Sequence, residues 1–142
     1  MTNIPADFEE TLERQRKALE AFYQGDAEQY IEMCSQRDPI SVFGAYGPCE
    51  TGWDKVTGAF RWVGSRYSNT SNFSFDIVVA EVLGDMAYVV AYERGDMSAD
   101  GGPVTPVTVR VSNVYRREDG EWKIVHRHGD FTARVRWDDG DR

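Results

Sequence analysis

The sequence predicts an α+β domain in which three amphipathic helices pack on a strongly curved antiparallel sheet. Helical periodicity dominates the chain up to about residue 68, and strand-like alternation with turn signals fills the rest. The predicted strands are also about twice the usual length of 5–6 residues. Strands of that length must twist and bend, so we expect a cone-shaped hollow between the helices and the concave face of the sheet.

Length and charge limit the classes of function. The length predicts one domain over residues 1–142, with a core at about 7–133 and an acidic tail at 134–142. Sixteen basic and 24 acidic residues give a formal net charge of −8. This chain lacks the basic surface with which proteins bind nucleic acid or anionic membranes. We therefore expect neither partner and interpret the charge as an aid to solubility.

Targeting and redox signals favour a cytoplasmic protein. No segment reaches the roughly 20 apolar residues that span a bilayer, and the acidic N-terminus has no apolar stretch of a secretory signal. Cys34 and Cys49 are the only cysteines, and their spacing matches neither a metal site nor a redox motif. We expect two free thiols in a reducing compartment, with no metal and no cofactor.

The first predicted helix begins near Asp7 and ends before Gly25. Asp7 and Glu10 have the spacing of a capping box, and Gly25 is placed to end the helix. Apolar residues recur with the period of one helix face at Phe8, Leu12, Leu19 and Phe22. This stripe is expected to face the core.

Two further helices follow, separated by a short strand. Asp26 and Gln29 repeat the capping spacing, and Asp38–Pro39 ends the second helix. A strand is predicted at residues 40–43 and a turn-rich segment at 44–49. Thr51 and Asp54 begin the third helix. The apolar stripes are Ala27, Tyr30, Ile31 and Cys34 in the second helix and Val56, Ala59, Phe60, Val63 and Tyr67 in the third.

Four long strands complete the chain. They are predicted near residues 73–79, 86–97, 104–117 and 121–128, with turns at 84–85, 100–103 and 119–120. Bends are expected at 91–95 and at Asn113. The strand at 104–117 is largely hydrophobic in both parities, so the face away from the helices should also be apolar. Burying that face requires a partner, and the sequence predicts a homodimer through the sheet.

Two stretches of sequence and the order of the elements resemble the NTF2-like superfamily, in particular its SnoaL-like and DUF4440-type branch. VRVSNVYRREDGEWKIVHRHGDF, residues 109–131, is similar to the C-terminal hairpin of that branch and of the calmodulin-dependent kinase association domain. SVFGAYG at 41–47 and TGWDKVTGAF at 51–60 resemble its first strand and third helix. The resemblance covers essentially the whole chain and implies the cystatin-like cone. It does not assign an activity, because the superfamily includes isomerases, dehydratases, cyclases and assembly domains.

At the positions that align with the functional residues of the best understood of these families, this chain lacks the required side chains. Ketosteroid isomerase resembles the chain in fold, but its general base would align near Phe43 and its oxyanion-hole tyrosine near Ala18. Its second acid would align near residues 109–110. Two pocket arginines of the kinase association domain would align near Asn113 and Gly129. Steroid isomerisation is therefore not expected.

The chain's two histidines, His126 and His128, lie two residues apart, and Asp130 follows at the same spacing. On an extended strand the three share a face with Trp122 and Ile124. If that face is concave, the histidines either hydrogen-bond backbone at the pocket wall or act as acid and base, with Asp130 fixing a tautomer. A metal site is the third alternative and the least favoured.

Polar residues within the apolar strands are the other candidates. Arg110 and Ser112 share parity, and an arginine there requires a partner. It either holds a carboxylate or enolate of a ligand or pairs with Glu93 or Asp96 on the adjacent strand. Alternation lets only one of Tyr92 and Glu93 face the pocket. Six aromatic residues are further candidates. They either line a ligand cavity or pack the core and a dimer contact: Tyr30, Phe43, Tyr46, Trp53, Phe60 and Trp62.

Two functions follow as hypotheses. The first is proton-transfer chemistry, such as isomerisation, dehydration or cyclisation, on an apolar carbonyl compound. His126, His128 or Asp130 would move protons, and Arg110 or Tyr92 would hold the oxyanion. The second is a ligand-binding or dimerisation module without turnover, whose cavity is filled by aromatic side chains. Its ligand would be a small apolar, carboxylate or carbonyl compound.

Overall fold

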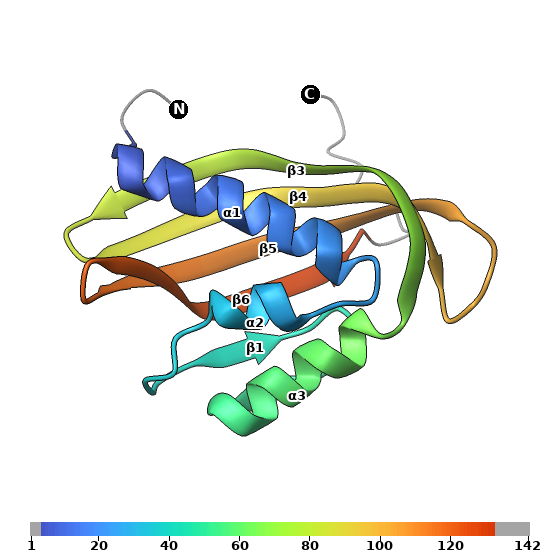
Figure 1. The fold of residues 1–142 in the computed structure, drawn as a ribbon, viewed down its shortest axis with the longest axis horizontal. Helices are drawn as coiled ribbons and strands as arrows, with labels where there is room; N and C mark the ends of the chain where they lie inside the picture. Colours follow the sequence, from blue (N-terminus) through green and yellow to red (C-terminus); the bar gives the residue numbers. More distant parts are fainter. Residues whose placement is uncertain (1–3, 133–142) are drawn as a thin grey trace, which may run out of the picture.

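A computed structural model describes residues 4–132, and within them three helices cover one face of a curved, unclosed six-stranded sheet (Figure 1). The strand order is β2-β1-β6-β5-β4-β3. The helices are α1 (Ala6–Phe22), α2 (Glu28–Glu32) and α3 (Trp53–Gly64). The strands are β1 (Ser41–Phe43), β2 (Cys49–Thr51), β3 (Tyr67–Leu83), β4 (Met86–Ala99), β5 (Thr105–Glu118) and β6 (Glu121–Phe131). The acidic tail predicted at 134–142 lies outside the described residues.

The α+β class and the long curved strands are confirmed, with two corrections to the predicted topology. The third helix follows the short strand predicted at 40–43, here β1, but an additional strand, β2, lies between them, so only α1 and α2 precede the sheet. The sheet is also not wholly antiparallel. Strand β1 pairs in parallel with the edge of β6, with Ser41 opposite His126 and Phe43 opposite His128.

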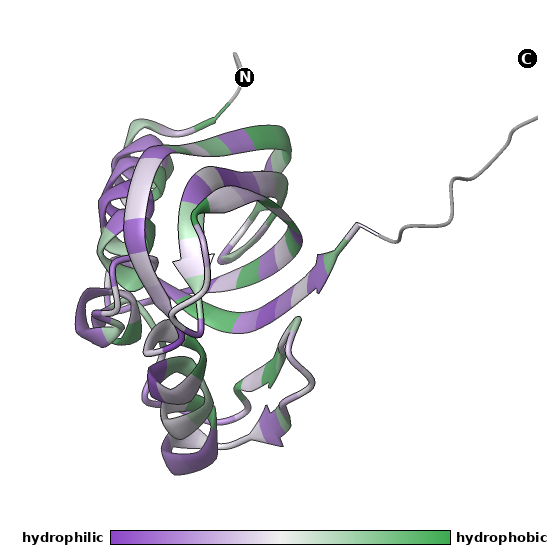
Figure 2. Cartoon of the chain, turned by 90° about the vertical axis from the view of Figure 1, so that its right-hand side faces the viewer, coloured by the Kyte–Doolittle hydropathy of each residue, from purple (hydrophilic) through white to green (hydrophobic). Residues whose placement is uncertain are grey.

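The core lies between the helices and one face of the sheet, which we call the helix-covered face. Helix α1 lies obliquely over the long strands (Figure 1) and places Phe8 against two of their aromatic rings. The Phe8 ring lies 5.0 Å from Tyr115 and 5.2 Å from Trp122, both in edge-on geometry. Within residues 4–132 the opposite side of the sheet carries no helix, and we call it the open face. Figure 2 shows how strongly the long strands curl when viewed from the end.

The predicted capping box of α1 is wrong. The helix begins after Pro5, and no side chain caps it. The Asp7 side chain instead binds the sheet. Its carboxylate accepts a hydrogen bond from Trp122 Nε1 at 3.1 Å and forms an ion pair with Arg117 at 2.8 Å. These contacts hold the first turn of α1 on the β5–β6 hairpin.

A bulge in β6 decides which side chains reach the core. Tyr115 lies opposite Ile124, but the next residue back along β5, Val114, lies opposite His126. Val125 is therefore an extra residue. Because alternation has a period of two, one inserted residue exchanges the faces for the rest of the strand. Further register shifts occur in β3, one of them opposite residues 94–96. The predicted bends at 91–95 and at Asn113 thus lie beside bulges of the neighbouring strands.

Both cysteines are free thiols, as predicted. Burial raises the pKa of Cys34 to about 12, which keeps that thiol protonated and unreactive. Cys49 is exposed on β2. Within residues 4–132, no helix is long and apolar enough to cross a bilayer.

Phe8→Ala is expected to destabilise the fold by about 3–5 kcal/mol, because the ring is fully buried and its loss leaves a cavity beneath α1. Urea unfolding monitored by tryptophan fluorescence measures this change in the free energy of unfolding. Val104→Ala, at a half-exposed position, serves as the control and should change stability by no more than about 0.5 kcal/mol. A loss below about 1 kcal/mol for Phe8→Ala would contradict the packing described above.

Candidate functional site

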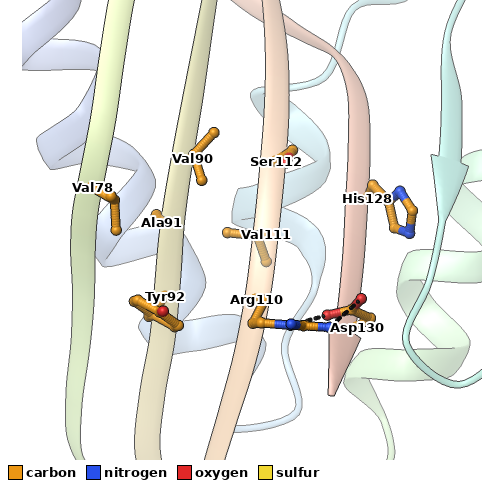
Figure 3. Close-up of a pocket in the computed structure, with 9 residues that line it drawn as sticks. All are labelled: Val78, Val90, Ala91, Tyr92, Arg110, Val111, Ser112, His128 and Asp130. Atoms are coloured by element: carbon orange, nitrogen blue, oxygen red, sulfur yellow. Dashed lines mark hydrogen bonds and ion pairs between the residues drawn. The ribbon is translucent and has the colours of Figure 1, made fainter. Parts of the chain in front are cut away.

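Five of the predicted site residues meet on the open face, in two adjacent cross-strand rows (Figure 3). In one row Arg110 lies between Tyr92 and Asp130; in the next, Ser112 lies between Val90 and His128. The small Ser112 side chain leaves a hollow of about 270 Å³ among larger neighbours. The residues that line it are Val78, Val90, Ala91, Tyr92, Arg110, Val111, Ser112, His128 and Asp130.

Arg110 and Asp130 form a two-pronged ion pair across β5 and β6. Arg110 Nε lies 2.7 Å from Asp130 Oδ1, and Nη2 lies 2.9 Å from Oδ2. The hydrogen bonds to Asp130 raise the pKa of the Arg110 guanidinium. The expected pairing of Arg110 with Glu93 or Asp96 is therefore wrong, because Glu93 lies on the other face of the sheet and the register sets Asp130 beside Arg110.

The two histidines lie on the open face and not in the predicted concave pocket. The bulge at Val125 is the reason, because Trp122 and Ile124 precede it and the histidines follow it. His126 Nδ1 is 2.6 Å from the Ser41 hydroxyl. The Phe43 ring lies edge-on to His126 at 5.6 Å and to His128 at 5.4 Å.

Burial lowers the pKa of His126, and the neighbouring His128 lowers it further, whereas a hydrogen bond with Ser41 acts in the opposite direction. Within residues 4–132, no three histidine, cysteine or carboxylate side chains converge closely enough to hold a metal ion.

The helix-covered face contains a buried ion pair between Glu93 and Arg127. Arg127 Nη1 lies 2.6 Å from Glu93 Oε2, and Nη2 lies 2.7 Å from Oε1. The Tyr23 hydroxyl donates to Glu93 Oε1 at 2.5 Å. Glu93 and Arg127 are only 1% and 7% exposed, so each charge depends on the other for compensation. Burial and the carboxylate together raise the pKa of Tyr23 well above its ordinary value, which keeps the hydroxyl a donor.

A second polar contact lies beside this pair. Burial raises the pKa of Tyr30, and its hydroxyl donates to Asn113 Oδ1 at 3.3 Å. The Arg127 guanidinium lies 5.5 Å from the centre of the Tyr30 ring. The interior pocket beside Arg127 has a volume of about 30 Å³, room for a water molecule but not for a substrate. Aromatic rings fill the cone, and Tyr23, Phe60 and Tyr67 line what is left.

The other predicted site residues are dispersed. Phe60 lines the interior and packs on Tyr30 at 5.1 Å. Tyr46 and Trp62 pack edge-on to each other and both contact Arg66, whose guanidinium is 4.5 Å and 4.6 Å from their ring centres. Trp53 packs against the edge of the core. None of these residues lines the open-face hollow.

Sequence reasoning missed the interior trio of Tyr23, Glu93 and Arg127 as a unit. One signal was available: Val125 is apolar at a position where strict alternation from Trp122 would place a residue on the open face. Two consecutive apolar residues in a strand that otherwise alternates are consistent with a bulge. A bulge at this position predicts that the Arg127 side chain faces the helix-covered side. A buried arginine there requires an acidic partner.

The geometry places the chain in a class of small α+β cones, and comparisons with known proteins agree. A ketosteroid isomerase-like protein of Erwinia carotovora atroseptica has 18% identity and a TM-score of 0.74 over 94% of this chain and 99% of the other. An NTF2-like protein of Cytophaga hutchinsonii has 16% identity and a TM-score of 0.65 over 90% and 100%. The CamKII hub homology domain of Chlamydamonas reinhardtii has 22% identity and a TM-score of 0.65 over 89% and 98%.

A family model described as a SnoaL-like domain matches residues 13–134. The match covers most of the sequence, so the chain belongs to the SnoaL-like domain family within the NTF2-like fold. The resemblance to the NTF2-like superfamily and its SnoaL-like branch is thereby confirmed. The solved structures share less than a quarter of their residues with this chain and support the fold alone.

Arg127→Met is expected to destabilise the chain by about 3–5 kcal/mol, because Glu93 is left charged and buried without its partner. Glu93→Leu combined with Arg127→Met should recover at least about 2 kcal/mol of that loss, since no charge then remains inside. Urea denaturation of the single and double variants measures both values. If the double variant is as unstable as Arg127→Met, the two side chains are not coupled as described.

In NMR titration, His126 is expected to have a pKa below the usual value of about 6.5. His128→Gln removes the neighbouring imidazole and should move the pKa of His126 upward, towards that value. The folded chain binds this proton less tightly than the unfolded chain, so stability should fall as the pH drops below about 6.5 and through the folded pKa. An unchanged pKa of His126 in the His128→Gln variant would contradict the proximity of the two rings.

Proposed function

We propose that the chain is a non-catalytic self-associating module that pairs with a second copy through the open face of its sheet. An exposed apolar patch carries this proposal. Six side chains from neighbouring strands contribute to the patch, each between 37% and 67% exposed: Val78, Val79, Leu83, Met86, Tyr88 and Val90. Apolar surface of this kind, opposite a helix-covered face, is typical of sheets that pack against a partner.

A second copy fits the patch better than an unlike partner of strong charge. Two pairs of charges beside the patch are compensated within the chain: Arg94 binds Asp76 at 2.9 Å, and Arg110 binds Asp130. Glu81, opposite Tyr88 on the same face, is exposed and forms no ion pair within residues 4–132. The patch therefore carries the single uncompensated charge of Glu81, against −8 for the chain as a whole. A two-fold axis through β3 and β4 would set one apolar patch on the other, which is the arrangement of an isologous dimer. One structure with a similar fold is named as a hub domain.

Proton-transfer catalysis inside the cone has less support. Glu93 is the interior carboxylate, and its oxygens already accept hydrogen bonds from Arg127 and Tyr23. A carboxylate held in this way is a poor general base, because taking a proton would break a buried ion pair. An interior space of about 30 Å³ also leaves no room for a carbonyl substrate.

Analytical ultracentrifugation at micromolar concentration is expected to show a species of about twice 16.1 kDa. Tyr88→Glu should weaken the dimer at least about tenfold, because a second carboxylate would then be buried beside Glu81 in the apolar patch. Val104→Glu is the matched control, since Val104 is also a large, partly exposed apolar residue but lies outside the patch. A monomer at all concentrations up to about 100 µM would refute the proposal.

A further inference from the structure

The open-face hollow has two chemically different walls (Figure 3). Strands β3 and β4 supply the apolar wall with Val78, Val90 and the Tyr92 ring. Arg94 stacks on that ring at 4.1 Å and so holds it in place. Strands β5 and β6 supply the polar wall with Arg110, Asp130, Ser112 and His128. A compound that fills this space needs an apolar body with polar atoms at one end.

The charges of the polar wall cancel. Arg110 and Asp130 neutralise each other through two hydrogen bonds, which use Nε and Nη2 of the guanidinium. Within residues 4–132, Arg110 Nη1 and the Ser112 hydroxyl hydrogen-bond to no other residue, so both can serve a ligand as donors. A ligand carboxylate would meet the Asp130 oxygens and lose its own hydration without a net positive charge in return. A carbonyl or hydroxyl oxygen meets the same donors without that cost.

The size of the hollow limits the ligand further. Pockets for drug-sized ligands range from about 300 to 1,000 Å³, so a hollow of about 270 Å³ suits a smaller compound with a single ring. We propose that this hollow binds a small neutral ketone or alcohol, with its oxygen towards Arg110 and Ser112 and its apolar body on Val90 and Tyr92. All the lining residues come from one chain, so the site goes beyond the proposed self-association and does not require it, although Val78 and Val90 belong both to the hollow and to the apolar patch.

The test uses two probes with similar skeletons: benzylacetone, a neutral methyl ketone, and hydrocinnamate, a carboxylate. Each is titrated into the chain while the His128 imidazole resonance is followed by NMR. Benzylacetone should shift that resonance saturably, with a Kd in roughly the millimolar range expected for so small a ligand. Hydrocinnamate should bind at least about tenfold more weakly, because of the Asp130 carboxylate. No saturable shift with benzylacetone would overturn the proposal.

Two substitutions test the shape and the charge of the site separately. Ser112→Phe fills the hollow and should abolish the saturable shift, whereas Thr105→Phe adds the same ring on β5 outside the hollow and should leave it unchanged. Asp130→Asn leaves Arg110 without its counter-charge and should strengthen hydrocinnamate binding at least about tenfold. Unaltered benzylacetone binding by Ser112→Phe, or unaltered hydrocinnamate binding by Asp130→Asn, would refute the site.

Other results separate this site from its alternatives. Shifts confined to Trp122 and Tyr23 would place the ligand inside the cone and overturn the proposal. Binding of benzylacetone by monomeric Tyr88→Glu but not by the dimer would show that a second copy occupies the hollow, and would overturn it as well. Ketone binding by a chain that stays monomeric would refute only the proposed self-association.

Discussion

The single extra residue in β6 is the constraint on which the rest of the structure depends. Val125 shifts the register between β5 and β6 and so exchanges the faces of every later residue in the strand. Arg127 enters the core, where Glu93 and the Tyr23 hydroxyl bind it into one buried network. His126, His128 and Asp130 reach the open face together with Arg110 and Ser112. Without the bulge these two sets of side chains would change places.

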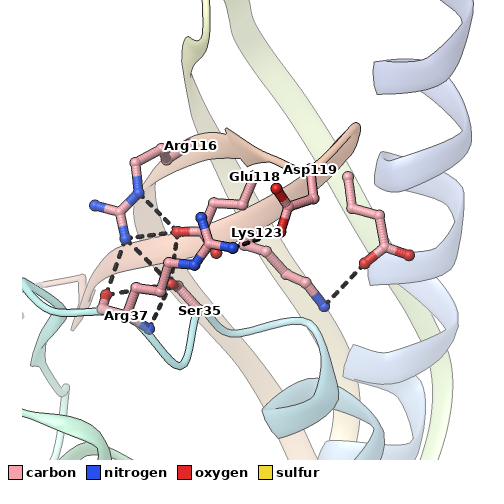
Figure 4. Close-up of polar contacts among 7 residues, drawn as sticks. Ser35, Arg37, Arg116, Glu118, Asp119 and Lys123 are labelled. Carbon is pink, nitrogen blue, oxygen red and sulfur yellow. Dashed lines mark hydrogen bonds and ion pairs between the residues drawn. The ribbon is translucent and has the colours of Figure 1, made fainter.

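The bulge also divides the side chains that stabilise the fold, inside the cone, from those that are exposed for binding, on the open face. Inside the cone, the buried charges satisfy each other and leave about 30 Å³, so the interior is built to hold the fold together. On the open face, apolar side chains and a hollow remain exposed, and surface of this kind indicates an interaction site. A second polar network lies at the end of the sheet near α2, where Arg116 and Ser35 both bind Glu118, so these polar groups are also satisfied within the chain (Figure 4). The part of the molecule available for binding is therefore the side without helices.

Much of the fold could be predicted from the sequence, because its signals are local. Helical stripes such as Phe8 to Phe22 and the alternation of the long strands follow directly from residue spacing. Side-chain caps were less predictable, since Asp7 is held by Trp122 and Arg117 from the far end of the chain. The parallel pairing of β1 with β6 joins segments more than eighty residues apart, and local residue spacing does not predict such a contact.

The candidate site was predicted in its members but not in its location. Arg110, Ser112, His128 and Asp130 share a face because each strand alternates, and that part could be read from the sequence. Their assignment to the concave face extended the alternation through Val125 from Trp122, and one bulge was enough to reverse it. The Arg110–Asp130 pair was missed because cross-strand partners depend on the same register.

The orientation of β6 can be measured directly by nuclear Overhauser effects from the ring protons of its two histidines. Contacts from both rings to the Phe43 ring, together with contacts from the Arg127 side chain to Tyr30, are the predicted result. Contacts from either histidine to Tyr23 or Tyr30 would contradict the bulge and would return the imidazoles to the interior.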